Sequence, residues 1–133
     1  MNIASKFINY VYSYMTISSK DIILASFPKA GNTWVRLFLF NYLLEYYNFK
    51  INTYINFDIL DRYMPEIGNK SIFQKWIFNP TRRIIKTHNK NNFFLNKIPV
   101  VYIDRDPRDI MISFYYYTKN NKQYYHNHDL SSF

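Results

Sequence analysis

The first segment with chemical potential is Phe27-Pro-Lys-Ala-Gly-Asn-Thr33, which follows an apolar run in this 133-residue sequence. Gly31 lets the backbone approach a ligand closely, Lys29 adds a mobile positive charge and Thr33 adds a hydroxyl. If the segment opens a helix, free backbone N–H groups and the helix dipole favour an anion there. The segment therefore predicts phosphate binding. It is not a Walker A loop, because that motif ends in Gly-Lys-Ser/Thr and here the lysine precedes the glycine.

Two later segments also place polar side chains after apolar runs. One ends in Lys86-Thr-His88, which offers a cation, a hydroxyl and an imidazole. The other is Asp104-Arg-Asp-Pro-Arg-Asp109, and Ser113 follows Arg105 by eight positions. An arginine before a helix and a hydroxyl two turns into it can hold one phosphate from two sides.

The elements that must position these residues alternate between strand and helix. Residues 22–27 form a nearly continuous apolar run, as expected of a strand in a parallel sheet covered on both faces. Residues 82–88 are expected to form a strand whose polar end emerges at Lys86 to His88, and residues 98–104 a third, buried strand rich in β-branched residues. Residues 33–46 lack Gly and Pro and are apolar on most faces, which predicts a largely buried helix. Asp106 and Pro107 suit the cap and first position of a helix that runs to about residue 117. Ligands bind at the carboxyl ends of strands in such α/β folds.

The remaining segments carry weaker signals. Helices are expected over residues 57–64 and, more briefly, 71–78, separated by Pro65 and Gly68. Two roles are open for the tyrosines of residues 115–117: they line a ligand pocket or, as we expect, they pack in a core or a lid. The sequence contains no linker or repeat, so residues 1–133 are expected to form a single domain.

Composition narrows the classes of function. The chain has 17 Lys and Arg against 9 Asp and Glu, a net charge of +8, which favours phosphates or other polyanions as ligands. It has no cysteine, which excludes disulfides, thiolate metal sites and cysteine nucleophiles and favours a cytoplasmic setting. The apolar residues from Trp34 to Leu44 are too few to cross a bilayer, and residues 1–16 are not expected to act as a signal peptide.

The three polar segments together resemble the sulfotransferase family. Phe27-Pro-Lys-Ala-Gly-Asn-Thr-Trp34 is similar to its phosphosulfate loop, written as aromatic-Pro-Lys-Ser-Gly-Thr-Thr-Trp. Arg83-Ile-Ile-Lys-Thr-His88 resembles the strand that delivers the catalytic histidine, and residues 100–113 resemble the strand and helix that bind a 3′-phosphate. The motifs occur in the family's order.

The resemblance implies a P-loop NTPase-like α/β fold, a parallel sheet flanked by helices. It implies transfer of a sulfuryl group from 3′-phosphoadenosine 5′-phosphosulfate (PAPS) to a hydroxyl or amine of a small-molecule, lipid or carbohydrate acceptor, without a metal. His88 would then be the general base, with Lys29 and Lys86 neutralising charge on the transferring group. The residues expected to bind the donor are Lys29, Ala30, Gly31, Asn32, Thr33, Trp34, Arg105 and Ser113.

Departures from the family pattern qualify this expectation. Ala30 stands where a serine is usual and Asn32 where a threonine is usual, although an asparagine can still donate hydrogen bonds. Gly31 and Gly68 are the two glycines of the sequence, so the family's later glycine-rich basic segment has no counterpart. We therefore expect an incomplete fold: a truncated domain, a remnant, or a minimal form that completes its site as a homo-oligomer.

Three alternatives stay open at this stage. A non-catalytic 3′-phosphoadenosine-binding module would keep the phosphate contacts without turnover. A small P-loop kinase would prefer Mg-ATP to the bisphosphate nucleotide. A basic nucleic-acid-binding protein would fit the charge and the aromatic content but not the polar residues at the strand ends.

Overall fold

A parallel sheet lies at the centre of the computed structural model, which describes residues 3–89 and 97–120. Within those residues the sheet has three strands in the order β2-β1-β3. They are β1 (Asp21–Ser26), β2 (Arg83–Thr87) and β3 (Val100–Ile103). In the ladder Ile23 is paired with Ile85 on one side and with Val100 on the other. The predicted α/β class and the parallel sheet are confirmed.

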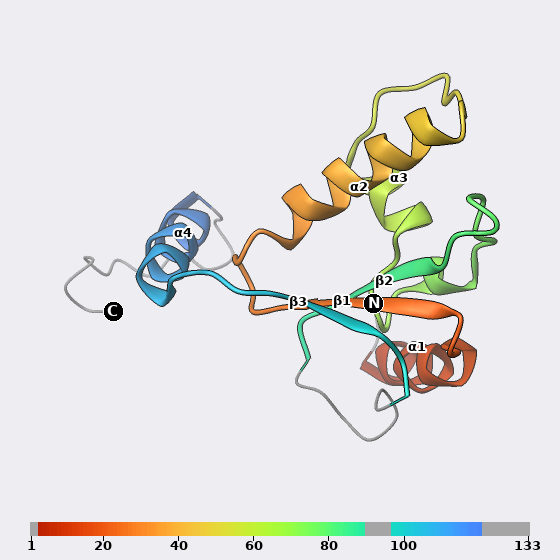
Figure 1. The fold of residues 1–133 in the computed structure, drawn as a ribbon. Coiled ribbons are helices and arrows are strands. Elements are labelled where there is room, and N and C mark those ends of the chain that lie inside the picture. Colours follow the sequence, from red (N-terminus) through yellow and green to blue (C-terminus); the bar gives the residue numbers. More distant parts are fainter. Residues whose placement is uncertain (1–2, 90–96, 121–133) are drawn as a thin grey trace.

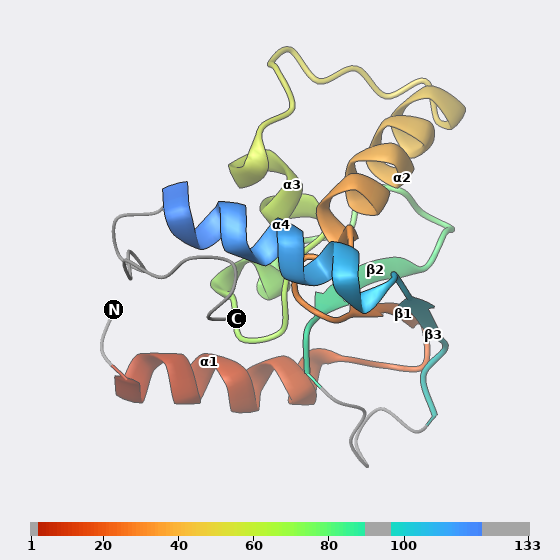
Figure 2. The ribbon, with the colours of Figure 1, turned by 90° about the vertical axis from the view of Figure 1, so that its left-hand side faces the viewer.

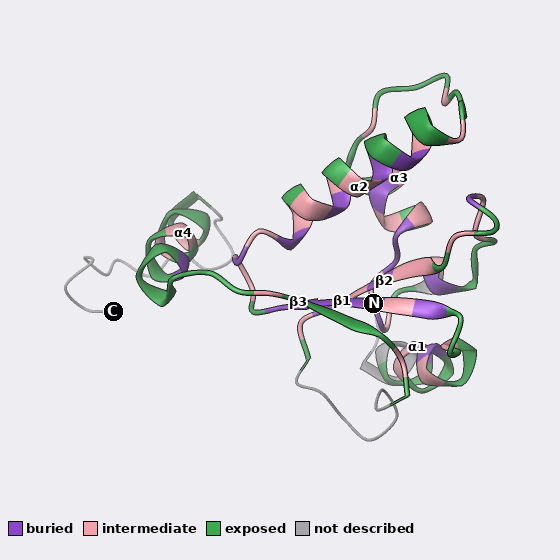
Figure 3. Cartoon of the chain, in the orientation of Figure 1, coloured by how far each residue is buried: buried purple, intermediate pink, exposed green. Residues whose placement is uncertain are grey.

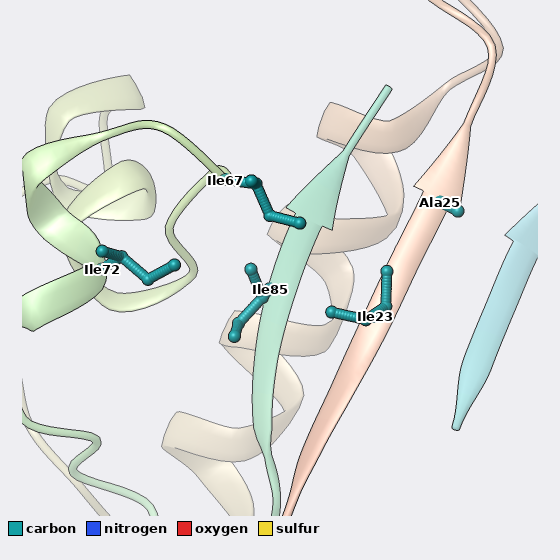
Figure 4. Close-up of a cluster of buried hydrophobic side chains, with 5 residues drawn as sticks. All are labelled: Ile23, Ala25, Ile67, Ile72 and Ile85. Atoms are coloured by element: carbon teal, nitrogen blue, oxygen red, sulfur yellow. The ribbon is translucent and has the colours of Figure 1, made fainter. Parts of the chain in front are cut away.

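Helices cover the two faces of the sheet. Figures 1 and 2 show α1 (Ile3–Thr16) on one side, with α2 (Asn32–Tyr46) and α3 (Phe57–Tyr63) on the other. On the α1 side, isoleucines of the sheet pack against the chain around a short 3₁₀ helix, η1 (Lys70–Phe73). Figure 4 shows this cluster, whose buried members are Ile23, Ala25, Ile67, Ile72 and Ile85.

The second cluster joins α2 to α3 and combines aliphatic with aromatic side chains. Its buried members are Phe40, Leu43, Leu60, Met64 and Phe78. Arg36 reinforces the same contact, since its Nη2 lies 2.5 Å from Asp61 Oδ1 and 2.5 Å from the Met64 carbonyl oxygen. The Arg36 side chain is 3% exposed and that of Asp61 is 41% exposed, so a buried guanidinium pairs here with a partly solvated carboxylate and links α3 to α2.

Helix α2 is less buried than the sequence predicts. Arg36, Phe40 and Leu43 face the protein, whereas the opposite face carries Trp34, Phe38, Tyr42 and Tyr46, all more than half exposed. Figure 3 shows this division along the helix. Apolar residues occupy both faces, so residue type alone does not distinguish the face that packs on the sheet.

Helix α1 is an element for which the sequence gave no prediction. Its inward face carries polar groups: Ser13 is fully buried, donates from Oγ to the Asn9 carbonyl oxygen at 2.6 Å and accepts from the Gly68 N–H at 2.9 Å. Its outward face carries exposed apolar residues such as Phe7 and Met15. Tyr10 and Tyr14 of α1 pack against the isoleucine cluster, so the inward face of this helix mixes polar with aromatic residues, and apolar residues also occupy its outward face.

The third strand lies at an edge of the sheet, not at its centre, so the prediction of a buried strand is wrong. Val100, Val101 and Tyr102 of β3 are between 43% and 62% exposed. β1 is its neighbour on one side, and no other described strand pairs with it. The β-branched residues identified the strand correctly, but its burial depends on what covers it.

The partly buried Tyr10 of α1 gives a testable pH dependence. Burial raises the pKa of this phenol to about 12, and a hydrogen bond with Tyr14 acts in the same direction. An unfolded tyrosine titrates near pH 10. The stabilisation from the neutral phenol is therefore complete below about pH 10 and is lost as the pH rises towards about 12.

We expect Tyr10→Phe to lessen the loss of folding stability between those two pH values. Denaturant midpoints measured across the range would show a shallower decline than in the wild type. Tyr54→Phe is the matched control, because Tyr54 is 95% exposed and should leave the slope unchanged. Parallel declines in the wild type and Tyr10→Phe would contradict the raised pKa.

Candidate active site

The loop between β1 and α2 has the backbone geometry expected of an anion site. Lys29 and Gly31 both adopt positive φ angles, 68° and 107°, and the Ala30 N–H closes a turn on the Phe27 carbonyl oxygen at 3.2 Å. Gly31 is the N-cap residue of α2 and supplies no side-chain hydrogen bond. The first N–H groups of α2 consequently have no intrahelical or capping side-chain partner and are available to a ligand.

Two cations converge on this loop. The Arg105 guanidinium, which precedes α4 (Pro107–Asn120), donates from Nη1 to the Lys29 carbonyl oxygen at 3.4 Å. Its Nε lies 3.6 Å from Asp109 Oδ2, and the side chain is 41% exposed. Lys29 Nζ lies 4.1 Å from the centre of the Tyr117 ring, a cation–π contact. The start of α4 is thus brought to the loop between β1 and α2.

Helix α4 begins where the sequence predicts. Asp106 accepts from the Arg108 N–H at 2.9 Å, as a capping side chain does. The Arg108 side chain folds back on the same carboxylate and holds the pKa of Asp106 below its usual range. Arg108 is therefore engaged outside the cleft.

His88 follows β2 and lies beside the end of β1. Its Nδ1 is 3.0 Å from the Ser26 carbonyl oxygen and 3.3 Å from Ser26 Oγ. The ring is half-buried, because β1 and β2 are neighbours in the parallel sheet and His88 packs where both strands end. This position beside the loop between β1 and α2 is the one that the strand-end argument predicts.

These groups line one cleft of about 490 Å³. Eight of the site residues predicted from sequence lie on its wall: Lys29, Gly31, Asn32, Thr33, Trp34, His88, Arg105 and Ser113. This cleft brings together predicted residues that are far apart in the sequence, and Lys29 and Ser113 are separated by 84 positions. The arrangement places an anion-binding helix terminus, two cations, a hydroxyl and an imidazole around one volume.

Two predicted residues lie elsewhere. Ala30 is 5% exposed and is buried in the turn behind the loop surface. Lys86 Nζ lies 3.0 Å from Glu66 Oε2, and its backbone pairs with the chain around Pro65. The structure does not bring the Lys86 ammonium to the wall of the cleft.

Sequence reasoning missed several residues of the wall. The additional lining residues are Pro28, Leu37, Phe57, Phe114 and Tyr117. Tyr117 was expected in a core or lid, yet it is 46% exposed and stands over Lys29. Leu37 lies one helical turn after Thr33 in α2, a spacing that was available in the sequence. No sequence spacing indicates Phe57, the first residue of α3. Its place on the wall depends on the tertiary contacts of α3, such as the ion pair of Arg36 with Asp61.

The described residues contain neither a cluster of metal-ligating side chains nor a membrane-spanning helix. No three or more His, Cys, Asp or Glu residues of 3–89 and 97–120 are grouped as a metal site would require. No helix in this part of the chain is long and apolar enough to cross a membrane.

Comparisons with known proteins agree with these motifs. The model of the family described as "Sulfotransferase domain" matches residues 19–133. Chimpanzee (Pan troglodytes) sulfotransferase 6B1 is 31% identical over 102 residues, which cover 73% of this chain and 32% of that protein. Luciferin sulfotransferase of Photinus pyralis is 30% identical over 126 residues, covering 76% of this chain and 34% of that protein.

A third relative matches a larger share of the chain. Human sulfotransferase 2A1 is 24% identical over 127 residues, covering 92% of this chain and 43% of that protein. No solved structure gives a significant match. The chain spans about a third of the length of the first relatives named above. With the family model matching most of its residues, the chain belongs to the sulfotransferase family.

Proposed function

We propose that the chain binds PAPS in the cleft between α2 and α4 and uses His88 as the general base for transfer of its sulfuryl group to an acceptor hydroxyl or amine. The observation that carries this proposal is the convergence of three distant segments on one cleft. The loop before α2 supplies a candidate anion site, the segment around α4 supplies Arg105 and Ser113, and the end of β2 supplies the imidazole of His88.

The residues around the cleft fit a donor with two phosphate sites. The N-terminus of α2, with Thr33 and the flexible ammonium of Lys29, would hold the 5′-phosphosulfate end. Arg105 and Ser113 would hold the 3′-phosphate, and exposed Trp34 offers a flat face for adenine. When bound, the donor supplies an activated sulfuryl group on a phosphate leaving group.

His88 would remove the proton of the attacking hydroxyl or amine. A neutral imidazole suits this role near neutral pH, and the ring reaches the cleft wall beside Lys29. Lys29 would stabilise negative charge that develops on the leaving oxygen. Small molecules, lipids and carbohydrates all remain acceptor classes within this proposal, which also retains the cytoplasmic setting favoured by the cysteine-free composition.

A second candidate is a nucleotide-binding module without turnover. The Lys86 to Glu66 ion pair favours it, because that contact engages a cation which the resemblance assigns to catalysis. The two candidates agree on donor binding and differ on transfer, so binding is tested first.

Arg105→Ala should weaken binding of 3′,5′-bisphosphoadenosine about tenfold to a hundredfold, since hydrogen bonds to charged groups contribute about 1.5–3 kcal/mol. Isothermal titration calorimetry of the 133-residue chain would measure this loss. Arg108→Ala is the matched control: Arg108 follows by three positions but pairs with Asp106 outside the cleft, so its loss should change affinity less than twofold.

The same titration separates the proposal from its rivals. Tighter binding of Mg-ATP than of the bisphosphate would favour a kinase and contradict the donor assignment. Equal losses of affinity in Arg105→Ala and Arg108→Ala would mean that net charge, and not a specific contact of Arg105, accounts for the binding. Salt-dependent binding of an arbitrary oligonucleotide, without preference for the 3′-phosphonucleotide, would support a nucleic-acid-binding protein.

A further inference from the structure

Ser26, the last residue of β1, lies between His88 and Asn32. On one side its carbonyl oxygen is 3.0 Å and its Oγ 3.3 Å from His88 Nδ1. On the other side, Asn32 Nδ2 donates to Ser26 Oγ at 3.0 Å and to the Leu24 carbonyl oxygen at 3.3 Å. These contacts form a continuous path from the first residue of α2 to the imidazole.

The carbonyl groups fix the direction of these hydrogen bonds. A carbonyl oxygen can only accept, so His88 Nδ1 carries the proton and donates to Ser26. The Ser26 hydroxyl oxygen has two lone pairs and accepts from both neighbours. Contact with the Leu24 carbonyl likewise orients the Asn32 amide with its nitrogen towards β1. In the neutral imidazole of His88, Nε2 is then the nitrogen without a proton.

Burial strengthens this arrangement. Asn32 is 4% exposed and Ser26 is 3% exposed, so water competes little for either group. These contacts also give a structural reason for the asparagine at position 32, where a threonine is usual in the family pattern. Its amide nitrogen has two N–H donors and reaches two acceptors, whereas a threonine hydroxyl has one.

We infer that Ser26 and Asn32 are positioning residues that hold His88 as the tautomer with its proton on Nδ1. This inference rests on the proposed function for the role of His88 as the base. A base needs an unprotonated nitrogen towards its substrate, and a fixed Nδ1–H leaves Nε2 in that state. Because Asn32 opens the helix proposed to hold the donor, the same residue links the donor loop to the base.

The tautomer can be observed directly in the whole chain. With ¹⁵N-labelled histidine, a long-range ¹H–¹⁵N correlation spectrum at alkaline pH distinguishes protonated from unprotonated ring nitrogens in each neutral imidazole. The sequence has three histidines, and the signals absent from His88→Gln identify those of His88. We expect the wild-type ring to be protonated on Nδ1. A wild-type ring protonated on Nε2 would overturn the inference.

Variants test the two positioning residues. Ser26→Ala removes one acceptor of Nδ1–H and the anchor of Asn32, so the share of the Nε2–H tautomer should rise severalfold. Ser26→Thr keeps the hydroxyl and should restore the wild-type spectrum. Asn32→Ala should shift the population in the same direction as Ser26→Ala.

Asn41→Ala is the matched control for Asn32→Ala. Asn41 lies on the same helix, is exposed, and donates to the Leu37 carbonyl oxygen at 2.7 Å, so its loss should leave the His88 signals unchanged. Wild-type tautomer populations in both Ser26→Ala and Asn32→Ala would overturn the inference. If Asn32→Ala does not fold, the comparison of Ser26→Ala with Ser26→Thr decides, since both variants differ from serine by a single methyl or hydroxyl group.

This experiment uses neither donor nor acceptor, so its outcome is distinct from that of the proposed function. If the chain shows the expected tautomers but does not bind 3′,5′-bisphosphoadenosine, the positioning role of Ser26 and Asn32 stands and the proposed function is contradicted. Where transfer is measured, Ser26→Ala should lower kcat about tenfold with little change in the KM for the donor, the pattern of an impaired base.

Discussion

Replacing His88 with alanine should lower the rate of sulfuryl transfer by about 10²- to 10⁴-fold, the usual contribution of a general base. The proposed role predicts this loss because no other described histidine lies on the cleft wall. Transfer of radiolabelled sulfate from the donor to a panel of phenols, alcohols and amines would measure it. The donor-binding groups lie on other elements, so affinity for 3′,5′-bisphosphoadenosine should stay within about twofold of the wild type.

Two results would count against this assignment. An unchanged transfer rate in His88→Ala would remove the imidazole from the mechanism. A loss of donor affinity as large as the loss of rate would show that His88 acts in binding, not in proton transfer. If the wild-type chain binds the donor analogue and transfers sulfate to no acceptor on the panel, the non-catalytic module becomes the better description.

The largest effect on stability is expected for Phe40→Ala, which should reduce the free energy of unfolding by about 3–5 kcal/mol. Phe40 is fully buried on α2, stacked on Tyr63 with ring centres 5.5 Å apart and edge-on to Phe78 at 5.7 Å. Removing its ring leaves a cavity between α2 and α3. Chemical denaturation would measure the loss, which is a large part of the stability of a typical small domain.

Phe38→Ala provides the matched control for this variant. Phe38 is the same residue type on the same helix, two positions earlier, but it is 69% exposed. Its replacement should cost less than about 1 kcal/mol, in keeping with exposed positions. Equal losses in the two variants would contradict the division of α2 into a buried and an exposed face.

The functional motifs were accessible from the sequence because each is local. A short apolar run followed by Lys29, Gly31 and Thr33 specifies a strand, a turn with positive φ and a helix start within a dozen residues. The cap of α4 by Asp106 is equally local. The rule that strand ends share one edge of a parallel sheet then placed Arg105 and His88 at the same cleft.

The burial of whole elements was less accessible. Residue type indicated that residues 98–104 contain a strand, but its exposure follows from its place at the edge of the sheet. Most faces of α2 carry apolar residues of its own, so the packing of this helix against α3 decides which face is buried. Helix α1 was not predicted because its inward face mixes Tyr10 and Tyr14 with polar groups that find partners across the fold, as Ser13 does with Gly68.

The sequence alone therefore determines the α/β class, the turn between β1 and α2 and the types of side chain around the candidate site. These follow from residue identity and from spacings of a few positions. The fold decides which lysine reaches the cleft and which groups contact the imidazole of His88. Lys86 lies in a matching motif yet pairs with Glu66, and His88 contacts Ser26, which is 62 positions away. Such contacts depend on the register of neighbouring strands and the packing of helices, neither of which is encoded within a single motif.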